Sequence, residues 1–284
     1  MIDDLSTGRK ENLSVLDRVR FVEGTINDTD MLRSEFSEVD FVFHQAAIPS
    51  VPRSVSDPLT SNEANVNGTL SVLTAARDGE VEKVMFASSS SVYGDTPTLP
   101  KVETMPPSPL SPYAVSKLAG EHYCRVFFEL YGLSTTALRY FNVYGPRQDP
   151  TSQYAAVIPK FTSALLKGES PTIYGDGEQS RDFTFVKDVV RGNILAAQSH
   201  ESDGKVLNCA TSQRITINDL FGKIRDMIGA DVEARHVDPV SGDIKHSLSD
   251  IGQAKRLMGY EPQFNINSGL ERTVDHFIKE GGYK

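Results

Sequence analysis

Short apolar runs alternate with longer helical patterns through the first half of the chain, and this alternation restricts the folds that it can adopt. Residues 40–44, 83–87 and 135–140 form compact apolar runs, as is typical of parallel strands buried on both faces. Between them, 60–78 and 113–131 carry apolar residues at helical spacing. Strand–helix–strand crossovers are right-handed, so the pattern predicts an α/β fold with a doubly wound parallel sheet.

The pattern changes after about residue 145, where several prolines and the stretch 172–177 with its two glycines indicate shorter helices and strands. Strand-like runs return at 183–186 and 206–210, with a helical segment between them. We therefore expect two interleaved domains. The larger comprises 1–146 plus about 183–210, and the smaller α/β domain comprises about 147–182 plus 211–284.

The first eight residues are typical of the end of a second strand in a dinucleotide-binding fold. Such a Rossmann-like fold opens with a strand, a glycine-rich turn and a helix whose N-terminus binds pyrophosphate, and its second strand ends in an acidic residue for the ribose hydroxyls. Asp3 suits that acidic position, although Asp3 and Asp4 also suit a solvated terminus. The sequence has no Gly-x-Gly-x-x-Gly or Gly-x-x-Gly-x-x-Gly motif.

The missing strand and helix have a mechanical consequence, because the first strand lies in the middle of the order 3-2-1-4-5-6. Strands two and four would then flank an open position, at roughly twice the usual spacing of ~4.8 Å. Either the sequence is a fragment of a chain that starts ~30 residues upstream, or it is a shortened variant with a damaged cofactor site. Without the pyrophosphate-binding turn, we expect dinucleotide binding to weaken about a hundredfold, which corresponds to roughly 3 kcal/mol.

Composition and charge exclude several classes of protein. The formal net charge is −9 at pH 7, which disfavours a nucleic acid partner. Cys124 and Cys209 are the only cysteines and lie far apart, which excludes a disulfide scaffold. No apolar stretch reaches the ~20 residues of a membrane span, and no basic leader follows Met1. The six histidines show no ligand spacing. We expect a cytoplasmic protein with no metal site and no membrane partner.

A serine run at the end of a buried strand and a tyrosine–lysine pair at the start of a helix form the strongest chemical signal. The run is 88–94, and the pair is Tyr113 and Lys117. Side chains at i and i+4 share one helix face, so the ammonium lies beside the phenol and, with a nicotinamide cation, favours its ionised form. A free phenol has a pKa of ~10, which is too high for a base at neutral pH. Ser89 would hydrogen-bond the same substrate oxygen.

At these positions the sequence resembles the extended short-chain dehydrogenase/reductase family, and in particular its NAD-dependent nucleotide-sugar 4-epimerases. The resemblance runs over essentially the whole chain from Asp3 onward. So many matches in the same order are highly specific. Besides the serine run and the tyrosine–lysine pair, the matching segments are 44–47, 50–54, 65–69, 111–113, 138–147, 181–183 and 241–243.

The resemblance implies NAD as the cofactor, a UDP-sugar as the substrate, and a homodimer paired through the helices 60–78 and 113–131. It implies a catalytic set of Ser89, Tyr113 and Lys117. The implied cofactor contacts are Asp3, Ala46, Ala47, Asn67, Ser88, Tyr113, Lys117 and Tyr140. The implied substrate contacts are Arg53, Ser89, Ser90, Asn142, Tyr174, Arg181, Asp243 and Ser247.

The resemblance favours epimerisation of UDP-glucose or UDP-N-acetylglucosamine through a 4-keto sugar. Dehydratases and decarboxylases of the superfamily usually carry carboxylates just after the catalytic serine, where this chain has Ser90 and Ser91. The small Ser247 would leave room for an N-acetyl group. Thr25 and Val240 depart from the family residues that face adenine and phosphate. A nucleotide-sugar dehydratase or decarboxylase remains an alternative, as does a truncated, non-catalytic relative that only binds nucleotide sugar.

Overall fold

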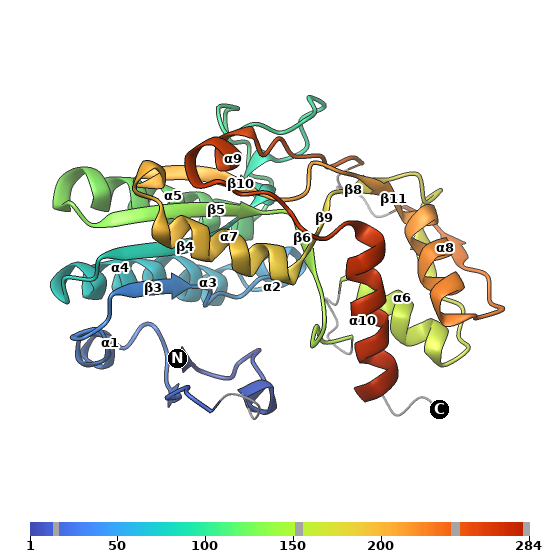
Figure 1. Cartoon of the computed structure of the whole chain (residues 1–284), viewed down its shortest axis with the longest axis horizontal. Helices are drawn as coiled ribbons and strands as arrows, with labels where there is room; N and C mark the ends of the chain where they lie inside the picture. Colours follow the sequence, from blue (N-terminus) through green and yellow to red (C-terminus); the bar gives the residue numbers. More distant parts are fainter. Residues whose placement is uncertain (14–16, 151–155, 240–244, 281–284) are drawn as a thin grey trace. The chain divides into compact units, whose positions relative to one another are not determined.

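The computed structural model describes residues 1–13, 17–150, 156–239 and 245–280. The chain divides into two compact units that alternate along the sequence (Figure 1). The sequence pattern places domain boundaries near 146, 183 and 210, and these boundaries stay a prediction. Unit 1 comprises Met1–Gly94, Pro106–Arg139 and Asn193–Leu207, and unit 2 comprises Asp95–Met105, Tyr140–Gly192 and Asn208–Lys284.

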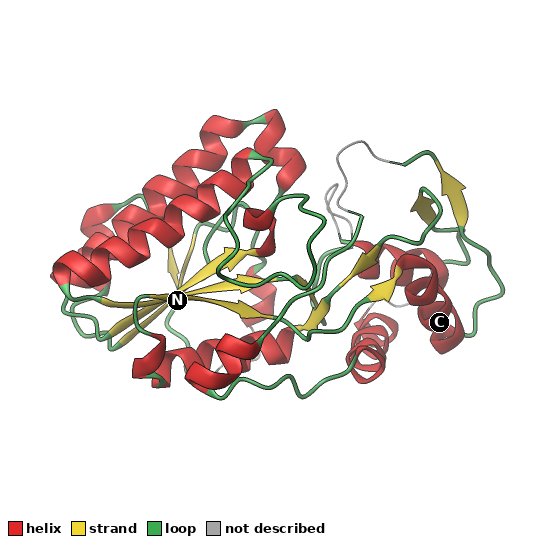
Figure 2. Cartoon of the chain, turned by 90° about the horizontal axis from the view of Figure 1, so that it is seen from above, coloured by secondary structure: helices red, strands yellow, loops and turns green. Residues whose placement is uncertain are grey.

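The main sheet has four strands: β3 (Phe41–His44), β4 (Lys83–Ser89), β5 (Ser134–Tyr140) and β10 (Lys205–Cys209). Their order in the sheet is β10-β5-β4-β3. Strands β3 and β4 run parallel, with Phe41 paired to Lys83. Helices lie on both faces of the sheet (Figure 2), so β4 is buried from Lys83 to Ser88 and reads as a nearly continuous apolar run. The predicted α/β fold with a parallel sheet is confirmed.

The long helix α5 (Pro112–Tyr131) packs on β4 and carries the predicted tyrosine–lysine pair. It begins where the Ser111 side chain accepts a hydrogen bond from the Ala114 N–H at 3.2 Å, and Pro112 stands in its first turn. Gly120 permits the close approach of helix and strand, because a Cβ atom there would lie 2.3 Å from the Phe86 ring. The sequence therefore fixes both where α5 starts and how near it comes to the sheet.

The predicted helix 60–78 is interrupted in the structure. A short helix α3 (Pro58–Asn62) is followed by a π-helical turn η2 (Glu63–Asn67) and then by α4 (Gly68–Asp78). A π turn widens the helix, which changes the residues that face the core from that point on. The other helices of unit 1 are α1 Thr29–Glu35 and α2 Val51–Ser56, with 3₁₀ turns η1 Lys10–Leu13, η3 Ser90–Tyr93 and η4 His200–Ser202.

Strands β1 (Ile2–Asp3) and β2 (Val22–Glu23) form a separate two-stranded parallel sheet. Among the described strands, none pairs with the second edge of β3. Two phenylalanines of this edge strand, Phe41 and Phe43, are 40% and 46% exposed. Strand β1 takes the place of strand two in the predicted order, and β3 takes the place of strand four. These two strands are not hydrogen-bonded to each other, as the strand-order argument predicts.

The described residues of unit 2 form three small strand pairs and a core of their own. The pairs are β6–β9 and β7–β12, which are parallel, and β8–β11, which is antiparallel. Tyr144, Phe161, Phe183, Leu220 and Leu270 are among the buried residues of the core. The strands are β6 Asn142–Tyr144, β7 Thr172–Tyr174, β8 Ser180–Arg181, β9 Phe183–Phe185, β11 Ile215–Thr216 and β12 Arg235–Val237. The helices are α6 Val157–Leu166, α8 Ile217–Ile228, α9 Gly252–Met258 and α10 Ile266–Glu280, and α7 (Val186–Gln198) continues from unit 2 into unit 1.

Candidate active site

Ser89 is the last residue of β4 and the N-cap of the turn η3. Its Oγ accepts a hydrogen bond from the Ser91 N–H at 3.2 Å. The turn ends at Gly94, whose φ of 63° suits glycine and where a Cβ atom would lie 2.0 Å from the Ser108 carbonyl oxygen. The sharp exit from the strand thus leaves the Ser89 hydroxyl at the carboxyl end of the parallel sheet, where ligands bind in open α/β folds.

Tyr113 and Lys117 lie in the first two turns of α5, as the spacing predicts. The Tyr113 N–H donates to the Ser54 Oγ at 3.0 Å, which ties the start of α5 to α2. A hydrogen bond with Ser89 joins the Tyr113 phenol to the end of β4. The Lys117 Nζ lies 5.8 Å from the centre of the Tyr113 ring and 5.1 Å from that of Phe86. The structure therefore brings the three predicted catalytic residues together.

Burial is the largest influence on the pKa values of Tyr113 and Lys117. It raises the pKa of Tyr113, and the hydrogen bond with Ser89 offsets only part of the rise. Burial also lowers the pKa of Lys117 from 10.5 to about 8. In the chain alone, desolvation therefore favours the neutral phenol. Ionisation by Lys117 together with a nicotinamide cation stays a prediction. A further positive charge beside the phenol is needed, which the sequence argument assigned to a nicotinamide ring.

Replacing Lys117 with Met is expected to raise the free energy of unfolding of the chain without added cofactor. The folded chain binds fewer protons than the unfolded chain between pH 8 and 10.5, so the wild type gains stability as the pH rises through that window. The advantage of the variant is therefore fully present below pH 8, at about 3 kcal/mol, and shrinks towards pH 10.5. Urea unfolding at several pH values checks this.

The exposed Lys160 of α6 provides a matched control. Lys160→Met also removes an ammonium group, but this group is in contact with water in the folded chain as well as in the unfolded chain. Its effect on the free energy of unfolding is expected to stay constant across the same pH range. A Lys117→Met advantage that grows with pH would contradict a buried ammonium at this position.

His44 and Asn65 fill the space beside Lys117 with neutral polar groups. Burial, with a smaller effect of Lys117, lowers the pKa of His44 to about 3, so its ring is neutral at physiological pH. The His44 Nε2 lies 2.9 Å from the Thr69 Oγ1. The Asn65 side chain accepts from the Ile48 N–H at 2.8 Å and donates to the Ser116 Oγ at 3.1 Å. Asn65 thus ties the loop after β3 to α5.

Sequence reasoning selected Asn67 in this segment and missed Asn65. Asn65 is buried, whereas Asn67 is exposed at the end of the π turn. Two asparagines that stand two residues apart point in different directions on a helix, and helical spacing alone does not tell which one faces the core when a π turn intervenes. The signal that distinguishes them is tertiary, namely the bonds of Asn65 to Ile48 and Ser116.

The remaining predicted cofactor residues lie at strand ends or just beyond them. Asp3 ends β1, and its Oδ1 accepts from the Leu5 N–H at 2.7 Å. Ser88 is buried, and its hydroxyl donates to Glu121. Cofactor contact stays a prediction for all of them. Ala46 and Ala47 follow β3 in half-buried positions, and Tyr140 ends β5.

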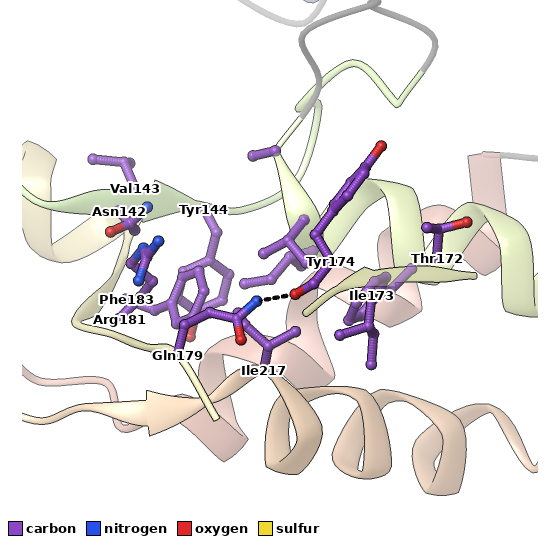
Figure 3. Close-up of a pocket in the computed structure, with 14 residues that line it drawn as sticks. Asn142, Val143, Tyr144, Thr172, Ile173, Tyr174, Gln179, Arg181, Phe183 and Ile217 are labelled. Carbon is purple, nitrogen blue, oxygen red and sulfur yellow. Dashed lines mark hydrogen bonds between the residues drawn. The ribbon is translucent and has the colours of Figure 1, made fainter. Parts of the chain in front are cut away.

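Three of the predicted substrate residues line one cavity of about 230 Å³ in unit 2 (Figure 3). Asn142 and Arg181 lie on one side of this cavity, and Tyr174 lies on β7. The volume is below the ~300–1,000 Å³ of pockets for drug-sized ligands, so the cavity suits part of a nucleotide, not all of it. Its apolar lining comes from Tyr144, Val157, Ile158, Phe161, Ile173, Phe183 and Ile217.

The backbone fixes Arg181 and Gln179 around this cavity. The Arg181 Nη1 donates to the Ser180 carbonyl at 3.1 Å and to the Lys245 carbonyl at 3.2 Å. The Gln179 Nε2 donates to the Tyr174 carbonyl at 2.8 Å, as the dashed line in Figure 3 shows. Sequence reasoning missed Gln179, whose only signal is its position two residues before Arg181 in the same short segment.

Four described residues of the predicted substrate set do not line this cavity: Arg53, Ser89, Ser90 and Ser247. Arg53 is half-buried on α2, and Ser90 is half-buried at the start of η3. Ser247 is half-buried, and its N–H donates to the Ser180 carbonyl at 2.9 Å, one residue before Arg181. Asp243 lies outside the described residues, as does the departure at Val240.

In the part of the chain that the structure describes, no group of three or more His, Cys, Asp or Glu side chains is arranged to hold a metal ion. No described helix combines the length and the apolar character that crossing a bilayer requires.

Comparison with known proteins gives consistent matches. Residues 2–210 match the model of the "NAD dependent epimerase/dehydratase family". The UDP-glucose 4-epimerase of Mycolicibacterium smegmatis is 40% identical to this chain, over 97% of this chain and 89% of that protein. The structure resembles UDP-N-acetylglucosamine 4-epimerase from Methanobrevibacter ruminantium M1, solved with UDP-N-acetylmuramic acid, at 45% identity and a TM-score of 0.94, covering 98% of this chain and 90% of that one.

A protein with a different activity matches as well. The dTDP-glucose 4,6-dehydratase from Streptomyces venezuelae, solved with NAD bound, is 33% identical to this chain with a TM-score of 0.91. The match covers 99% of this chain and 88% of that one. Similarity of the whole chain therefore does not by itself separate epimerases from dehydratases, and the residues of the site must do so.

Proposed function

Because the chain belongs to the NAD-dependent epimerase/dehydratase family, we propose that it is a 4-epimerase of a UDP-sugar. The observation that carries the proposal is the grouping of Ser89, Tyr113 and Lys117, with the short hydroxyl side chains of Ser90 and Ser91 directly after the serine. Epimerisation needs one group that takes and returns a proton at a single sugar oxygen. Dehydration and decarboxylation need a further acid or base, which the positions of Ser90 and Ser91 do not supply.

The family is NAD-dependent, and the residues around Lys117 fit that cofactor. Lys117 is only 4% exposed, and its ammonium group lies beside the rings of Phe86 and Tyr113. A buried ammonium is costly unless it is hydrogen-bonded, and a pair of ribose hydroxyls would supply acceptors for it. Lys117 and Tyr113 would thus hold the nicotinamide ribose, while the Asp3 carboxylate at the end of β1 suits the ribose of the adenosine half. Bound NAD supplies reversible oxidation at C4 of the sugar.

The residues of the chain handle the proton and the sugar oxygen. The Tyr113 phenolate takes the proton of the C4 hydroxyl, and the Ser89 Oγ donates a hydrogen bond to the same oxygen as it becomes a carbonyl. Lys117 favours the ionised phenol once the cofactor charge is added to its own. The 4-keto sugar then presents its other face, and Tyr113 returns the proton to the C4 oxygen. The reaction has no net redox change.

The proposed substrates are UDP-glucose and UDP-N-acetylglucosamine with their C4 epimers. The cavity of unit 2 supports binding of the nucleotide, because Arg181 supplies a guanidinium that suits a diphosphate in a protein with a net charge of −9. The small side chain of Ser247 supports acceptance of the N-acetyl group. The similarity to the Methanobrevibacter enzyme named for UDP-N-acetylglucosamine supports the same substrate.

Product analysis tests the proposal. The chain is incubated with each UDP-sugar and with NAD, and the sugar products are followed by proton NMR and mass spectrometry. Interconversion of C4 epimers at unchanged mass is expected. Loss of water would indicate a dehydratase, and loss of carbon dioxide from a UDP-uronic acid would indicate a decarboxylase. Binding of UDP-sugar without any product would indicate a non-catalytic relative.

The proposed assembly is a homodimer paired through the segments 60–78 (the end of α3, η2 and α4) and 113–131 (α5), with the adjoining start of α3. Leu59 of α3 is 82% exposed, Val115 and Leu130 of α5 are 53% and 71% exposed, and α3 contacts α5. Large apolar side chains in this position favour burial against a second copy. We expect sedimentation at micromolar concentration to show a dimer, and the Leu59→Glu/Val115→Glu variant to be a monomer.

The exposed Val190 of α7 serves as the control for the dimer prediction. Val190→Glu adds a charge to an apolar position of similar exposure on a helix outside the proposed interface, and is expected to leave the dimer intact. A stable wild-type monomer at micromolar concentration would contradict the proposed assembly.

A further inference from the structure

A buried carboxylate lies on α5 one turn beyond Lys117. Tyr113, Lys117 and Glu121 are spaced by four residues, so they follow one face of the helix. The Glu121 side chain is 3% exposed. It accepts a hydrogen bond from the Ser88 Oγ, and two from Arg139, through Nε at 2.8 Å and Nη2 at 2.7 Å. The proposed mechanism uses none of these three bonds.

The donors to Glu121 come from β4, which ends in the catalytic Ser89, and from the neighbouring strand β5. Ser88 directly precedes Ser89 at the end of β4, and Arg139 lies near the end of the neighbouring strand β5. The Arg139 guanidinium also lies 4.5 Å from the centre of the Tyr93 ring, at the end of the turn that follows Ser89. One carboxylate thus connects α5 to β4 and β5, at the residue that directly precedes Ser89.

Arg139 stays charged in this ion pair, because the effect of Glu121 on the Arg139 pKa is larger than the effect of desolvation. Burial by itself lowers the pKa of Arg139, but the hydrogen bonds and charge of Glu121 raise it above its ordinary value. A buried ion pair of this kind contributes little net stability, since apolar residues of similar volume often serve as well or better. What apolar residues do not supply is a directional bond to the Ser88 hydroxyl.

We propose that Glu121 is a positioning residue that fixes Ser89 relative to Tyr113 and Lys117, an inference that rests on the proposed 4-epimerase function. The Ser88 hydroxyl bond holds the end of β4 against the helix that carries the base. A displacement of about 1 Å at reacting groups costs on the order of 10²-fold in rate. The carboxylate therefore acts on the chemical step through backbone geometry, without touching the substrate.

The Lys83–Asp203 ion pair offers a matched control in the same unit. Lys83 is the first residue of β4, whereas Ser88 is next to its last, so the two ion pairs lie towards opposite ends of one strand. The Lys83 Nζ lies 2.5 Å from the Asp203 Oδ1, and both side chains are largely buried. A purely structural role for Glu121 predicts the same behaviour when either pair is replaced by apolar residues. A positioning role predicts a different outcome for each pair.

The experiment compares Glu121→Leu/Arg139→Met with Lys83→Met/Asp203→Leu. Both double variants are expected to fold. We expect the Glu121 variant to lose about 10- to 100-fold in kcat at a KM for UDP-sugar within about twofold of wild type, and the Lys83 variant to keep its kcat. Ser88→Ala removes one bond and leaves the ion pair intact, and is expected to lower kcat about 3- to 10-fold and the melting temperature by only a few degrees. Ser88→Ala decides the matter if the Glu121 double variant does not fold.

Amide hydrogen exchange without substrate separates this inference from the proposed function. We expect exchange in the segment 89–94 to speed up at least about tenfold in Ser88→Ala and in the Glu121 double variant, and to stay unchanged in the Lys83 double variant. A wild-type chain without epimerase activity would overturn the proposed function, while the exchange result still decides the positioning role. Unchanged exchange in 89–94, or an active wild type with unchanged kcat in the Glu121 and Ser88 variants, would overturn the inference.

Discussion

Tyr113→Phe is expected to reduce kcat for epimerisation by about 10³-fold and to leave the affinity for UDP-sugar nearly unchanged. The phenolic oxygen takes and returns the proton at the C4 oxygen, and general acid–base groups of this kind contribute ~10²–10⁴-fold. Nucleotide binding is assigned to unit 2, whose cavity Tyr113 does not line. Calorimetric titration with UDP-sugar and single-turnover kinetics measure the two effects separately.

Tyr123→Phe on the same helix is the matched control. Tyr123 is half-buried against the core of unit 1, and its hydroxyl makes no hydrogen bond within the described residues. The control is expected to keep the wild-type rate. A Tyr113→Phe variant that retains more than about a tenth of the wild-type rate would exclude Tyr113 as the base, since a tenfold loss is below the lower bound for such catalysis.

Ser247→Tyr is expected to remove activity on UDP-N-acetylglucosamine, with a loss of at least about 10²-fold in kcat/KM, while activity on UDP-glucose changes little. Ser247 is held against β8 by its bond to the Ser180 carbonyl, one residue from Arg181, which lines the cavity of unit 2. A bulky ring there would reduce the space for the substituent on C2. Because the keto sugar must present both faces, that space affects turnover as well as binding.

Ser247→Ala is the control for this specificity change. It removes the hydroxyl without adding volume, and is expected to preserve kcat/KM for both sugars. Comparing kcat/KM for the two sugars in wild type and both variants decides the matter. If tyrosine lowers activity on both sugars equally, or on neither, Ser247 does not control which sugar is accepted.

The sequence predicts the fold where a pattern reflects burial directly. Strand β4 reads as apolar because both of its faces are covered, and α5 shows its helical spacing and its serine–proline start in the sequence itself. The break of the predicted helix 60–78 at η2 has no such signal. Apolar spacing continues through the π turn, and the buried Asn65 is held by Ile48 and Ser116, which are distant in sequence.

The candidate site likewise contains residues that local sequence patterns reveal and residues that only tertiary contacts reveal. Ser89, Tyr113 and Lys117 follow from local spacing, which carries over into the structure as a shared helix face and a strand end. Glu121 does not follow, because a glutamate on a helix is ordinarily solvated, and only its remote partners reveal that it is buried. The raised pKa of Tyr113 is likewise invisible in the sequence, since it depends on how much water the folded chain excludes.

The interleaving of the two units constrains how proteins of this kind can change their substrates. Unit 2, which carries the cavity proposed to bind the nucleotide, is built from three separate stretches of chain, and Met1–Gly94, Pro106–Arg139 and Asn193–Leu207 belong to unit 1. No single recombination event can transplant unit 2 onto another unit 1, as it could with domains joined end to end. Under the proposed function, new sugar specificity therefore arises by single substitutions, at positions such as Ser247, and the proposed catalytic unit is inherited together with them.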